Sequence, residues 1–253
     1  MSGIKVKTKI MKLEARIRKW ICKAVQGKLW RRPVVGFCSA DSTEKLPKIV
    51  ENHLTAEEIL PSAKGVVSFF IPFTESVIKS NIGGEMPSKL WAYAYVRTNE
   101  LIREISNLIA KRLERLGFKC EIIEPTHNFD EVTLKSRWSH KHVAYLAGIG
   151  TFGVHTMIIT EKGCCGRLGS LITTAEFDGK PIEEEFCLHK RGYDCLECVK
   201  RCFAGALNPF DRKKCYETLM RNSKVHGFFA DVCGKCACGV PCSSKNPSPQ
   251  TKI

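Results

Sequence analysis

Cysteines are the residues whose type and spacing most directly indicate chemistry in this sequence. The chain has 14 of them in 253 residues, and nine lie between Cys187 and Cys242. Thiolates bind soft metal ions and iron–sulfur clusters, and cysteines gathered in this way stay reduced inside cells instead of forming disulfides. The C-terminal part of the chain is therefore predicted to hold metal.

The nine cysteines fall into two runs. They read Cys187-x7-Cys195-x2-Cys198-x3-Cys202 and Cys233-x2-Cys236-x-Cys238-x3-Cys242, with Cys215 between them. Two-cluster ferredoxins use such runs, in which three cysteines hold one [4Fe–4S] cluster and the fourth reaches the other. The fourth crosses because it lies a helical turn beyond the tight loop that carries the other three. We therefore predict a first set of ligands, Cys187, Cys195, Cys198 and Cys242, and a second set, Cys202, Cys215, Cys233 and Cys236.

Two features of these runs leave alternatives open. The residue three before Cys195 is Gly192, so the first ligand must be Cys187 on a longer loop, and Cys238 replaces Cys236 in a rival second set. Paired Cys-x2-Cys sequences are also typical of structural zinc sites. Zinc would leave four cysteines without a role, namely Cys187, Cys202, Cys215 and Cys242.

Length and hydropathy bound the kind of protein. A chain of 253 residues buries a full-sized core and carries a smaller second module. Its apolar runs stay below the about 18 residues that span a bilayer. The basic stretch from Lys5 to Lys28 lacks the apolar core of a signal peptide. We therefore expect a cytoplasmic protein without a membrane partner.

The formal net charge of +14 indicates acidic partners. Two oxidised clusters, each about −2 with its four thiolates, lower this charge to about +10. A polyanion such as tRNA fits this charge, and so does an acidic electron donor such as ferredoxin or flavodoxin. A solvated basic surface is the alternative explanation.

The apolar patterns predict a mixed α+β chain. An amphipathic basic helix covers residues 9–26, and the longest helix covers 88–116, with an apolar stripe that includes Leu90, Tyr93 and Leu116. The remaining predicted elements are strands over 34–38, 66–71, 118–123, 157–160 and 168–173, and a helix over 139–147.

Shifts in composition divide the chain into four predicted parts. An acidic, loop-like stretch over 174–186 marks the main boundary. The predicted parts are a basic N-terminal helix over 1–30, a larger domain over 31–180, a double-cluster domain over 181–245 and a disordered tail over 246–253.

A glycine turn follows the helix over 139–147. Its sequence, Gly148-x-Gly150-x-x-Gly153, matches a dinucleotide-binding fingerprint, but that fingerprint needs a strand before it and a helix after it. Here the order is reversed, which disfavours nicotinamide binding. The glycines still leave backbone that a flat ligand can approach closely.

Histidines and adjacent cysteines around this turn have ordinary explanations. His140 and His142 point to different sides of a helix, so they cannot bind one metal together. Surface or capping roles are favoured over approach to a corrinoid or proton donation. His155 follows the glycine turn and is expected to face a cofactor. Cys164 and Cys165 lie in a turn between strands and are expected to be ordinary thiols.

Beyond the cysteines, five stretches carry a family resemblance. They are Leu60–Ser68, Tyr93-Ala94 with Arg97, Ala147–Gly153, Leu168–Ser170 and Ala204–Leu207. Together with the cysteine runs they resemble the epoxyqueuosine reductase family of cobalamin-dependent iron–sulfur enzymes, which is related to reductive dehalogenases. This chain looks like a short member that lacks the C-terminal repeat domain. The resemblance implies an α+β fold, in which a nitroreductase-like α/β sandwich domain holds a corrinoid against a small ferredoxin-like domain with two [4Fe–4S] clusters.

The resemblance also implies a function and a cofactor site. The clusters would pass single electrons to a corrinoid, cobalamin, that reduces an unidentified substrate, since the cofactor supplies the chemistry and the protein supplies orientation. The implied cofactor-binding residues are Arg97, Gly148, Gly150, Thr151, Phe152, Gly153 and His155.

Departures from the family pattern concern the catalytic residues. The family's general-acid aspartate aligns with Leu134, so Asp130 or Glu131 takes that role only if the alignment slips, and His155 is a further candidate.

The long helix departs from the family as well. Thr98 and Asn99 stand where the family has an acid and a tyrosine. This departure favours a ferredoxin-like electron-transfer protein or a reductive activator of a corrinoid protein. A reductase that modifies tRNA is the other alternative, and the basic charge supports it.

Overall fold

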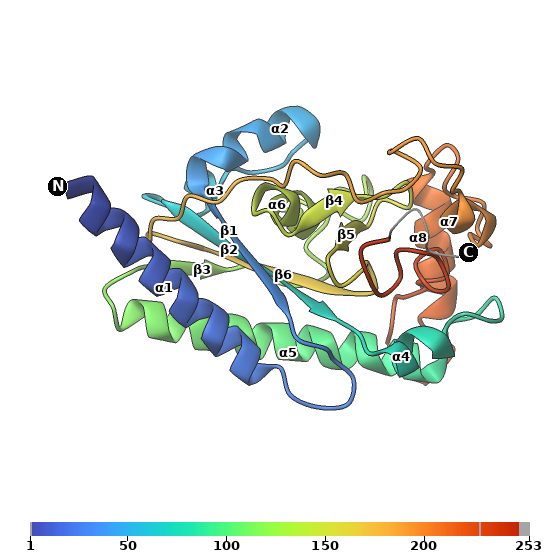
Figure 1. Ribbon diagram of the computed structural model, residues 1–253. Coiled ribbons are helices and arrows are strands. Elements are labelled where there is room, and N and C mark those ends of the chain that lie inside the picture. Colours follow the sequence, from blue (N-terminus) through green and yellow to red (C-terminus); the bar gives the residue numbers. More distant parts are fainter. Residues whose placement is uncertain (1, 228, 248–253) are drawn as a thin grey trace.

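The computed structural model describes residues 2–227 and 229–247, which form layers around one antiparallel sheet (Figure 1). The strands of this sheet are β1 (Val34–Ser39), β2 (Gly65–Pro72), β3 (Cys120–Ile122) and β6 (Gly166–Thr173), in the spatial order β1-β2-β6-β3. A separate hairpin consists of β4 (Gly150–Phe152) and β5 (Ile158–Thr160). β2 is buried along its whole length, because helices cover both faces of the sheet.

The helices form two layers and an end cap. They are α1 (Ser2–Ala24), η1 (Ala40–Lys45), α2 (Leu46–Ile49), α3 (Ala56–Ile59), α4 (Glu75–Ser80), α5 (Lys89–Glu114), α6 (His140–Leu146), α7 (Glu197–Lys200) and α8 (Arg212–Asn222). In Figure 1, α1 and α5 run along one face of the sheet, and α2, α3 and α6 lie on the other. The segment with α7 and α8 lies at one end of the sheet.

The main core lies between the sheet and the pair of α1 and α5. Ile17 and Ile21 of α1 are fully buried, and they belong to one cluster with Ile102 and Ile105 of α5 and Phe69 of β2. Each such side chain stabilises the fold by about 1.5–3 kcal/mol on burial. The predicted basic amphipathic helix is therefore confirmed, although it begins earlier, at Ser2.

The predicted apolar stripe of α5 is wrong at its ends. Leu90, Tyr93 and Leu116 are 37%, 48% and 42% exposed. The buried face instead carries polar side chains that have partners from distant segments, among them Thr98, whose Oγ1 accepts a 2.7 Å hydrogen bond from Trp30 Nε1. A buried polar group is tolerated when it is hydrogen-bonded. The apolar pattern alone therefore did not predict which side chains of α5 are buried in this part of the helix.

A half-buried arginine and a buried lysine dock the cysteine-rich segment on the body. Arg31 donates to the carbonyl of Ser244 at 2.8 Å and to the carbonyl of Lys162 at 2.7 Å. Lys235 is only 1% exposed and donates to the carbonyls of Asn81 and Gly83, at 3.1 and 2.7 Å. One apolar cluster also joins both parts of the chain. The domain boundaries drawn from the sequence stay a prediction.

The ends of the chain add two observations. Among residues 2–227 and 229–247, no helix combines the length and the apolar composition that crossing a bilayer requires. The tail predicted to be disordered, 246–253, lies outside the described residues from position 248 onward.

Gly36 of β1 lies directly under the end of α6, and enlarging it is expected to destabilise the protein. A Cβ atom at this position would lie 2.2 Å from the carbonyl oxygen of Ala147. Gly36→Ala should lower the free energy of unfolding by about 1–3 kcal/mol, as other overpacking substitutions do, and so lower the midpoint of thermal unfolding. Gly83→Ala is the control, because a Cβ there meets nothing within 4 Å; equal midpoints for the two variants would contradict the packing argument.

Candidate metal centre

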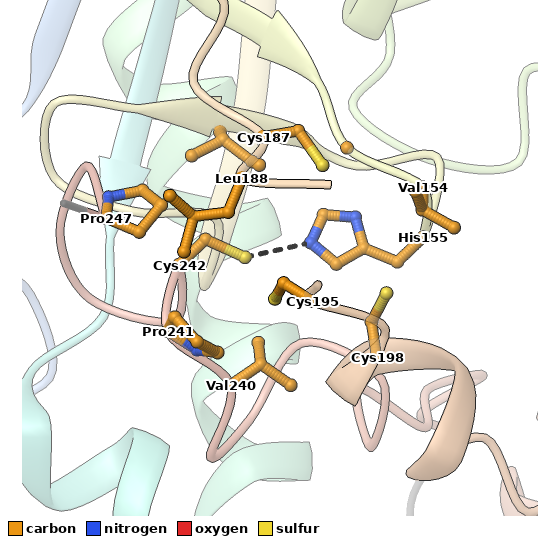
Figure 2. A pocket seen from close by; sticks show the side chains of 12 residues that line it. Val154, His155, Cys187, Leu188, Cys195, Cys198, Val240, Pro241, Cys242 and Pro247 are labelled. Atoms are coloured by element: carbon orange, nitrogen blue, oxygen red, sulfur yellow. Dashed lines mark hydrogen bonds between the residues drawn. The ribbon is translucent and has the colours of Figure 1, made fainter. Parts of the chain in front are cut away.

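The first set of cysteines lines one cavity at the end of the sheet (Figure 2). The space between its walls, counted up to its open mouth, is about 320 Å³. Its lining includes all four residues of the first set together with His155. Cys195 lies just before α7 and Cys198 lies within it. Cys187 and Cys242, which are more than fifty residues apart in the sequence, line the same cavity.

Thr151 holds the loop that carries Cys187. Its hydroxyl donates to Glu185 Oε1 at 2.7 Å and accepts from the Phe186 backbone at 2.9 Å. The same carboxylate oxygen accepts from the backbone N–H of Cys187 at 2.8 Å. Thr151, which the sequence placed among cofactor-binding residues, thus positions a cysteine of the first set.

His155 is directed at Cys242 (Figure 2). Its side chain is 1% exposed, and Nε2 lies 3.4 Å from Cys242 Sγ. Nδ1 accepts a 3.2 Å hydrogen bond from the backbone N–H of Met157. A neutral imidazole therefore carries its proton on Nε2 and donates it to the sulfur. This histidine lines the same cavity as the four cysteines of the first set.

The sulfurs of the second set lie close enough to affect one another's ionisation. Burial raises the pKa of the Cys236 thiol, and the thiolates of Cys233, Cys202 and Cys215 raise it further. Burial and the thiolates of Cys233 and Cys202 likewise raise the pKa of Cys215. Four sulfurs that repel one another's negative charge need a cation between them when they ionise, which is what a metal centre provides.

Cys238 lies apart from this second set. It is fully buried, its Sγ is 3.9 Å from Cys165 Sγ, and it accepts a 3.5 Å hydrogen bond from Asn81 Nδ2. This placement favours Cys236 over Cys238 as a ligand; the choice itself stays a prediction.

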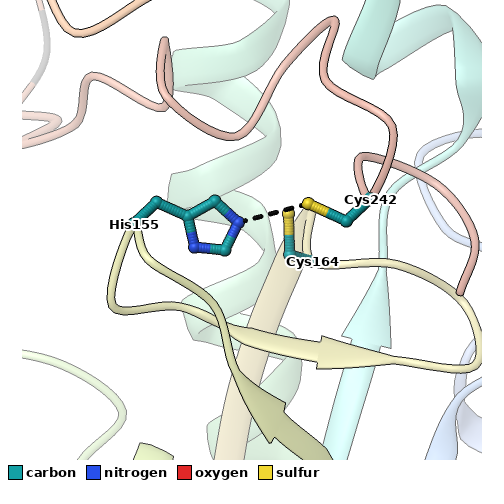
Figure 3. Close-up of side chains that lie close together, drawn as sticks. All are labelled: His155, Cys164 and Cys242. Atoms are coloured by element: carbon teal, nitrogen blue, oxygen red, sulfur yellow. Dashed lines mark hydrogen bonds between the residues drawn. The ribbon is translucent and has the colours of Figure 1, made fainter. Parts of the chain in front are cut away.

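A third sulfur-rich group involves residues that the sequence had treated as ordinary thiols. His155, Cys164 and Cys242 bring one ligand atom each to within 4.8 Å of one another (Figure 3). Cys165 is next to them and is 1% exposed. Nothing local distinguishes Cys164 and Cys165, because their neighbours in space come from the end of the chain.

The glycine turn packs against the protein's own atoms. A Cβ at Gly148 would lie 2.5 Å from the carbonyl oxygen of Lys180, and one at Gly150 would lie 2.0 Å from that of Ile159. A Cβ at Gly153 would lie 2.5 Å from the His155 ring. Chain packing accounts for these glycines, so they do not by themselves indicate a flat ligand.

The other predicted cofactor residues are dispersed. Phe152 stacks near His142, with ring centroids 4.8 Å apart. Arg97 lies on the exposed side of α5 and pairs with Glu100. Of the seven predicted residues, Gly153 and His155 line the cavity of the first set. These residues do not fit a common corrinoid site in the described structure, and corrinoid binding stays a prediction.

Asp130 does not suit a general acid. Its carboxylate accepts hydrogen bonds from the backbone N–H and the hydroxyl of Thr133, at 2.7 and 2.8 Å. These bonds lower the pKa of Asp130, so the group is ionised at neutral pH. It lines a polar groove with Lys135, whereas His155 lines the cavity of the first set. Glu131 is exposed on the same loop.

A buried tyrosine and aspartate meet beside the second set. Tyr95 Oη donates to Asp231 Oδ1 at 2.6 Å, and His127 Nε2 is 3.3 Å from Asp231 Oδ2. The guanidinium of Arg167 lies 4.3 Å from the centre of the Tyr95 ring. The contact between Tyr95 and Asp231 joins α5 to a segment 136 residues later in the chain.

The sheet, its helical layers and the cysteine-rich end define a mixed α/β fold, and several solved structures share it. An epoxyqueuosine reductase superposes with a TM-score of 0.62 at 18% identity, over 95% of this chain and 70% of its own. The epoxyqueuosine reductase of Bacillus subtilis gives 0.60 at 17% identity, over 95% and 70% of the two chains.

A catabolic reductive dehalogenase gives a TM-score of 0.61 at 17% identity, over 85% of this chain but only 30% of its own. Family models and curated proteins yield no match to the sequence. At these identities the likeness shows the fold, and it confirms that the resemblance found in the sequence extends to the structure. The division into nitroreductase-like and ferredoxin-like domains stays a prediction.

Removing the hydrogen bond from His155 is expected to lower the reduction potential of a cluster on the first set. A donor to a ligand sulfur stabilises the more negative, reduced cluster. His155→Phe should therefore shift the midpoint to a more negative value in an EPR-monitored redox titration. His155→Gln retains an N–H donor and should keep a midpoint close to that of the wild type. An unchanged midpoint in His155→Phe would count against the bond.

Proposed function

We propose that this protein is an iron–sulfur oxidoreductase that holds two [4Fe–4S] clusters, one on each set of four cysteines. The observation that carries the proposal is the convergence of Cys187, Cys195, Cys198 and Cys242 on one cavity. The raised pKa values of the Cys215, Cys233 and Cys236 thiols support the other cluster. The fold shared with epoxyqueuosine reductases supports the reductase class.

The cysteines, once ionised, would hold the clusters, which supply one-electron transfer when bound. The two sets are connected by a short piece of chain, since Cys198 belongs to the first and Cys202 to the second. Such short connections keep two clusters close enough for electrons to pass between them. His155 donates a hydrogen bond to Cys242 of the first set and so would adjust the electron affinity of a cluster bound there.

A corrinoid as the final electron acceptor is a separate part of the proposal. Its support is the fold of a reductive dehalogenase whose structure is described as suggesting a mechanism for B12-dependent dehalogenation, with a TM-score of 0.52 at 17% identity over 69% of this chain and 23% of its own. We assign no residue to corrinoid contact, because the glycine turn packs on the protein itself. Equilibrium dialysis of the reconstituted protein with micromolar cobalamin tests this part, and absence of binding removes it.

Two further functions are alternatives. Without substrate chemistry of its own, the chain would deliver electrons to a partner protein, such as a corrinoid protein that needs reductive activation, after receiving them from a ferredoxin or flavodoxin. The other alternative is a reductase that modifies tRNA. Its basic charge of +14 also supports binding to tRNA, and one solved relative was crystallised with a modified tRNA stem loop. Binding to tRNA must weaken steeply with salt, because phosphate contacts release counterions.

Anaerobic purification followed by iron, sulfide and zinc analysis tests the central proposal. We expect about eight iron and about eight sulfide per chain, a brown colour, and EPR signals after reduction. A colourless protein with stoichiometric zinc would overturn the proposal in favour of structural zinc sites.

A further inference from the structure

Of the buried cysteines outside the two sets, three lie close to the first set; the fourth, Cys38, lies in a different core cluster. Cys164, Cys165 and Cys238 are 6%, 1% and 0% exposed. Cys164 lies within 4.8 Å of Cys242, a cysteine of the first set (Figure 3). Cys165 follows in sequence, and its Sγ is 3.9 Å from Cys238 Sγ. The sulfur atoms of these three cysteines thus form a row that leads from Cys242 of the first set into the protein interior.

The backbone holds these sulfurs in place. The N–H groups of Cys164 and Cys165 donate to the carbonyls of Cys242 and Ser243, at 2.9 and 3.0 Å. This pairing fixes the turn between β5 and β6 against the last cysteine run. The positions of Cys164 and Cys165 therefore depend on the metal-binding segment itself.

The side chains of Cys165 and Cys238 are also held. Cys165 Sγ is 3.1 Å from the carbonyl oxygen of Ala237, to which its thiol donates, and Asn81 Nδ2 donates to Cys238 Sγ at 3.5 Å. Asn81 is fully buried and also donates to the carbonyl of Cys233, a residue of the second set. Cys165 and Cys238 are thus in contact with the segments that carry the first and the second set of cysteines.

Burial restricts the partners with which this pair can react. A disulfide there has no surface at which a soluble thiol could attack, and thiol–disulfide exchange requires such access. Electrons can still reach it through the packed sulfurs of Cys164 and Cys242. A disulfide needs a sulfur separation of about 2.05 Å, so each sulfur must move by only about 1 Å from its present place.

We propose that Cys165 and Cys238 form a redox-active pair that exchanges two electrons with the clusters. The inference rests on the proposed function, because the clusters are its electron source. In the reductive direction the Cys165–Cys238 bond breaks, each of two reduced clusters gives up one electron, and two protons are taken up to leave two thiols. In the oxidative direction the pair returns two electrons, one to each oxidised cluster, and releases two protons. The clusters carry one electron each, and the cysteine pair would store two electrons and release them together.

Peptide mapping of the holo-protein tests the pair without any activity assay. Samples are poised anaerobically with redox mediators at a series of potentials, quenched in acid, alkylated and digested. We expect a peptide that links Cys165 to Cys238 at oxidising potentials, and its replacement by two alkylated thiols at reducing potentials. Free thiols at both positions across the whole range would overturn the inference, and so would a bond that joins Cys164 to Cys165 instead.

An electron count on the same samples gives a second, independent measurement. Oxidised wild-type protein should take up four electrons per chain from titanium(III) citrate, two for the clusters and two for the pair. Cys165→Ala and Cys238→Ala should each take up two. The control Cys38→Ala, which removes a fully buried cysteine in a different core cluster, should still take up four. Uptake of two electrons by the wild type would overturn the inference, whereas iron and sulfide contents decide the proposed function separately.

Discussion

Replacing Cys236 with alanine is expected to halve the iron content of the protein, from about eight to about four atoms per chain. The reason is that Cys236 lies among the thiolates of Cys233, Cys202 and Cys215, which raise its pKa together with burial. Cys238→Ala should leave the iron content unchanged, because Cys238 contacts Cys165 and Asn81 instead. Iron analysis after anaerobic purification measures both variants.

The first set provides the matching experiment. Cys198→Ala should also leave about four iron atoms, but with the EPR signal of the other cluster. Cys38→Ala controls for the general effect of removing a buried cysteine, since Cys38 lies in the core beside α6. Loss of iron in Cys238→Ala with full retention in Cys236→Ala would reverse the assignment of the second set.

Acidification is expected to release the clusters, with a loss of affinity of more than tenfold for each pH unit. Burial, and then the nearby thiolates, raise the pKa of the Cys198 thiol to about 12, and burial raises those of Cys233 and Cys236. Without a cluster these thiols are protonated at neutral pH, and binding must displace their protons. Because binding releases several protons at once, affinity falls as pH falls throughout the range below the raised pKa values.

Chelator challenge at several pH values measures this effect. The rate at which a ferrous chelator removes iron should rise steeply between about pH 8 and about pH 6. Circular dichroism on the same samples shows whether the fold persists, which separates release of clusters from acid unfolding. A removal rate that does not change with pH would mean that the thiols are already ionised before the clusters bind.

Local patterns in the sequence were sufficient for the long helices and the main strands, but not for α4, β4 and α8. The strands around Val67 and Leu171 and the helix that starts after Ser139 were predicted close to their observed positions. Each depends on side chains a few residues apart, whose spacing decides which face is apolar. The cysteine sets depend on spacing in the same way, because a tight loop limits which thiolates can share a cluster.

Surfaces shared by distant segments could not be predicted in this way. Only the ends of the predicted apolar stripe of α5 were misplaced. Thr98 and Asn99 were not expected to be buried; they are, because they have hydrogen-bond partners, Trp30 and Arg167, from elsewhere in the chain. His155 was expected to face a cofactor; that it points at Cys242, which follows 87 residues later, could not be predicted from local sequence.

By itself, the sequence determined the mixed α/β class and the positions of the long helices and main strands, because these depend on residues close together along the chain. Only the tertiary structure decided that Cys164 and Cys165 lie against the last cysteine run and that Tyr95 meets Asp231. The physical reason is that packing of the C-terminal segment on the end of the sheet creates these contacts. Their energy comes from desolvated surfaces and hydrogen bonds that no local pattern records.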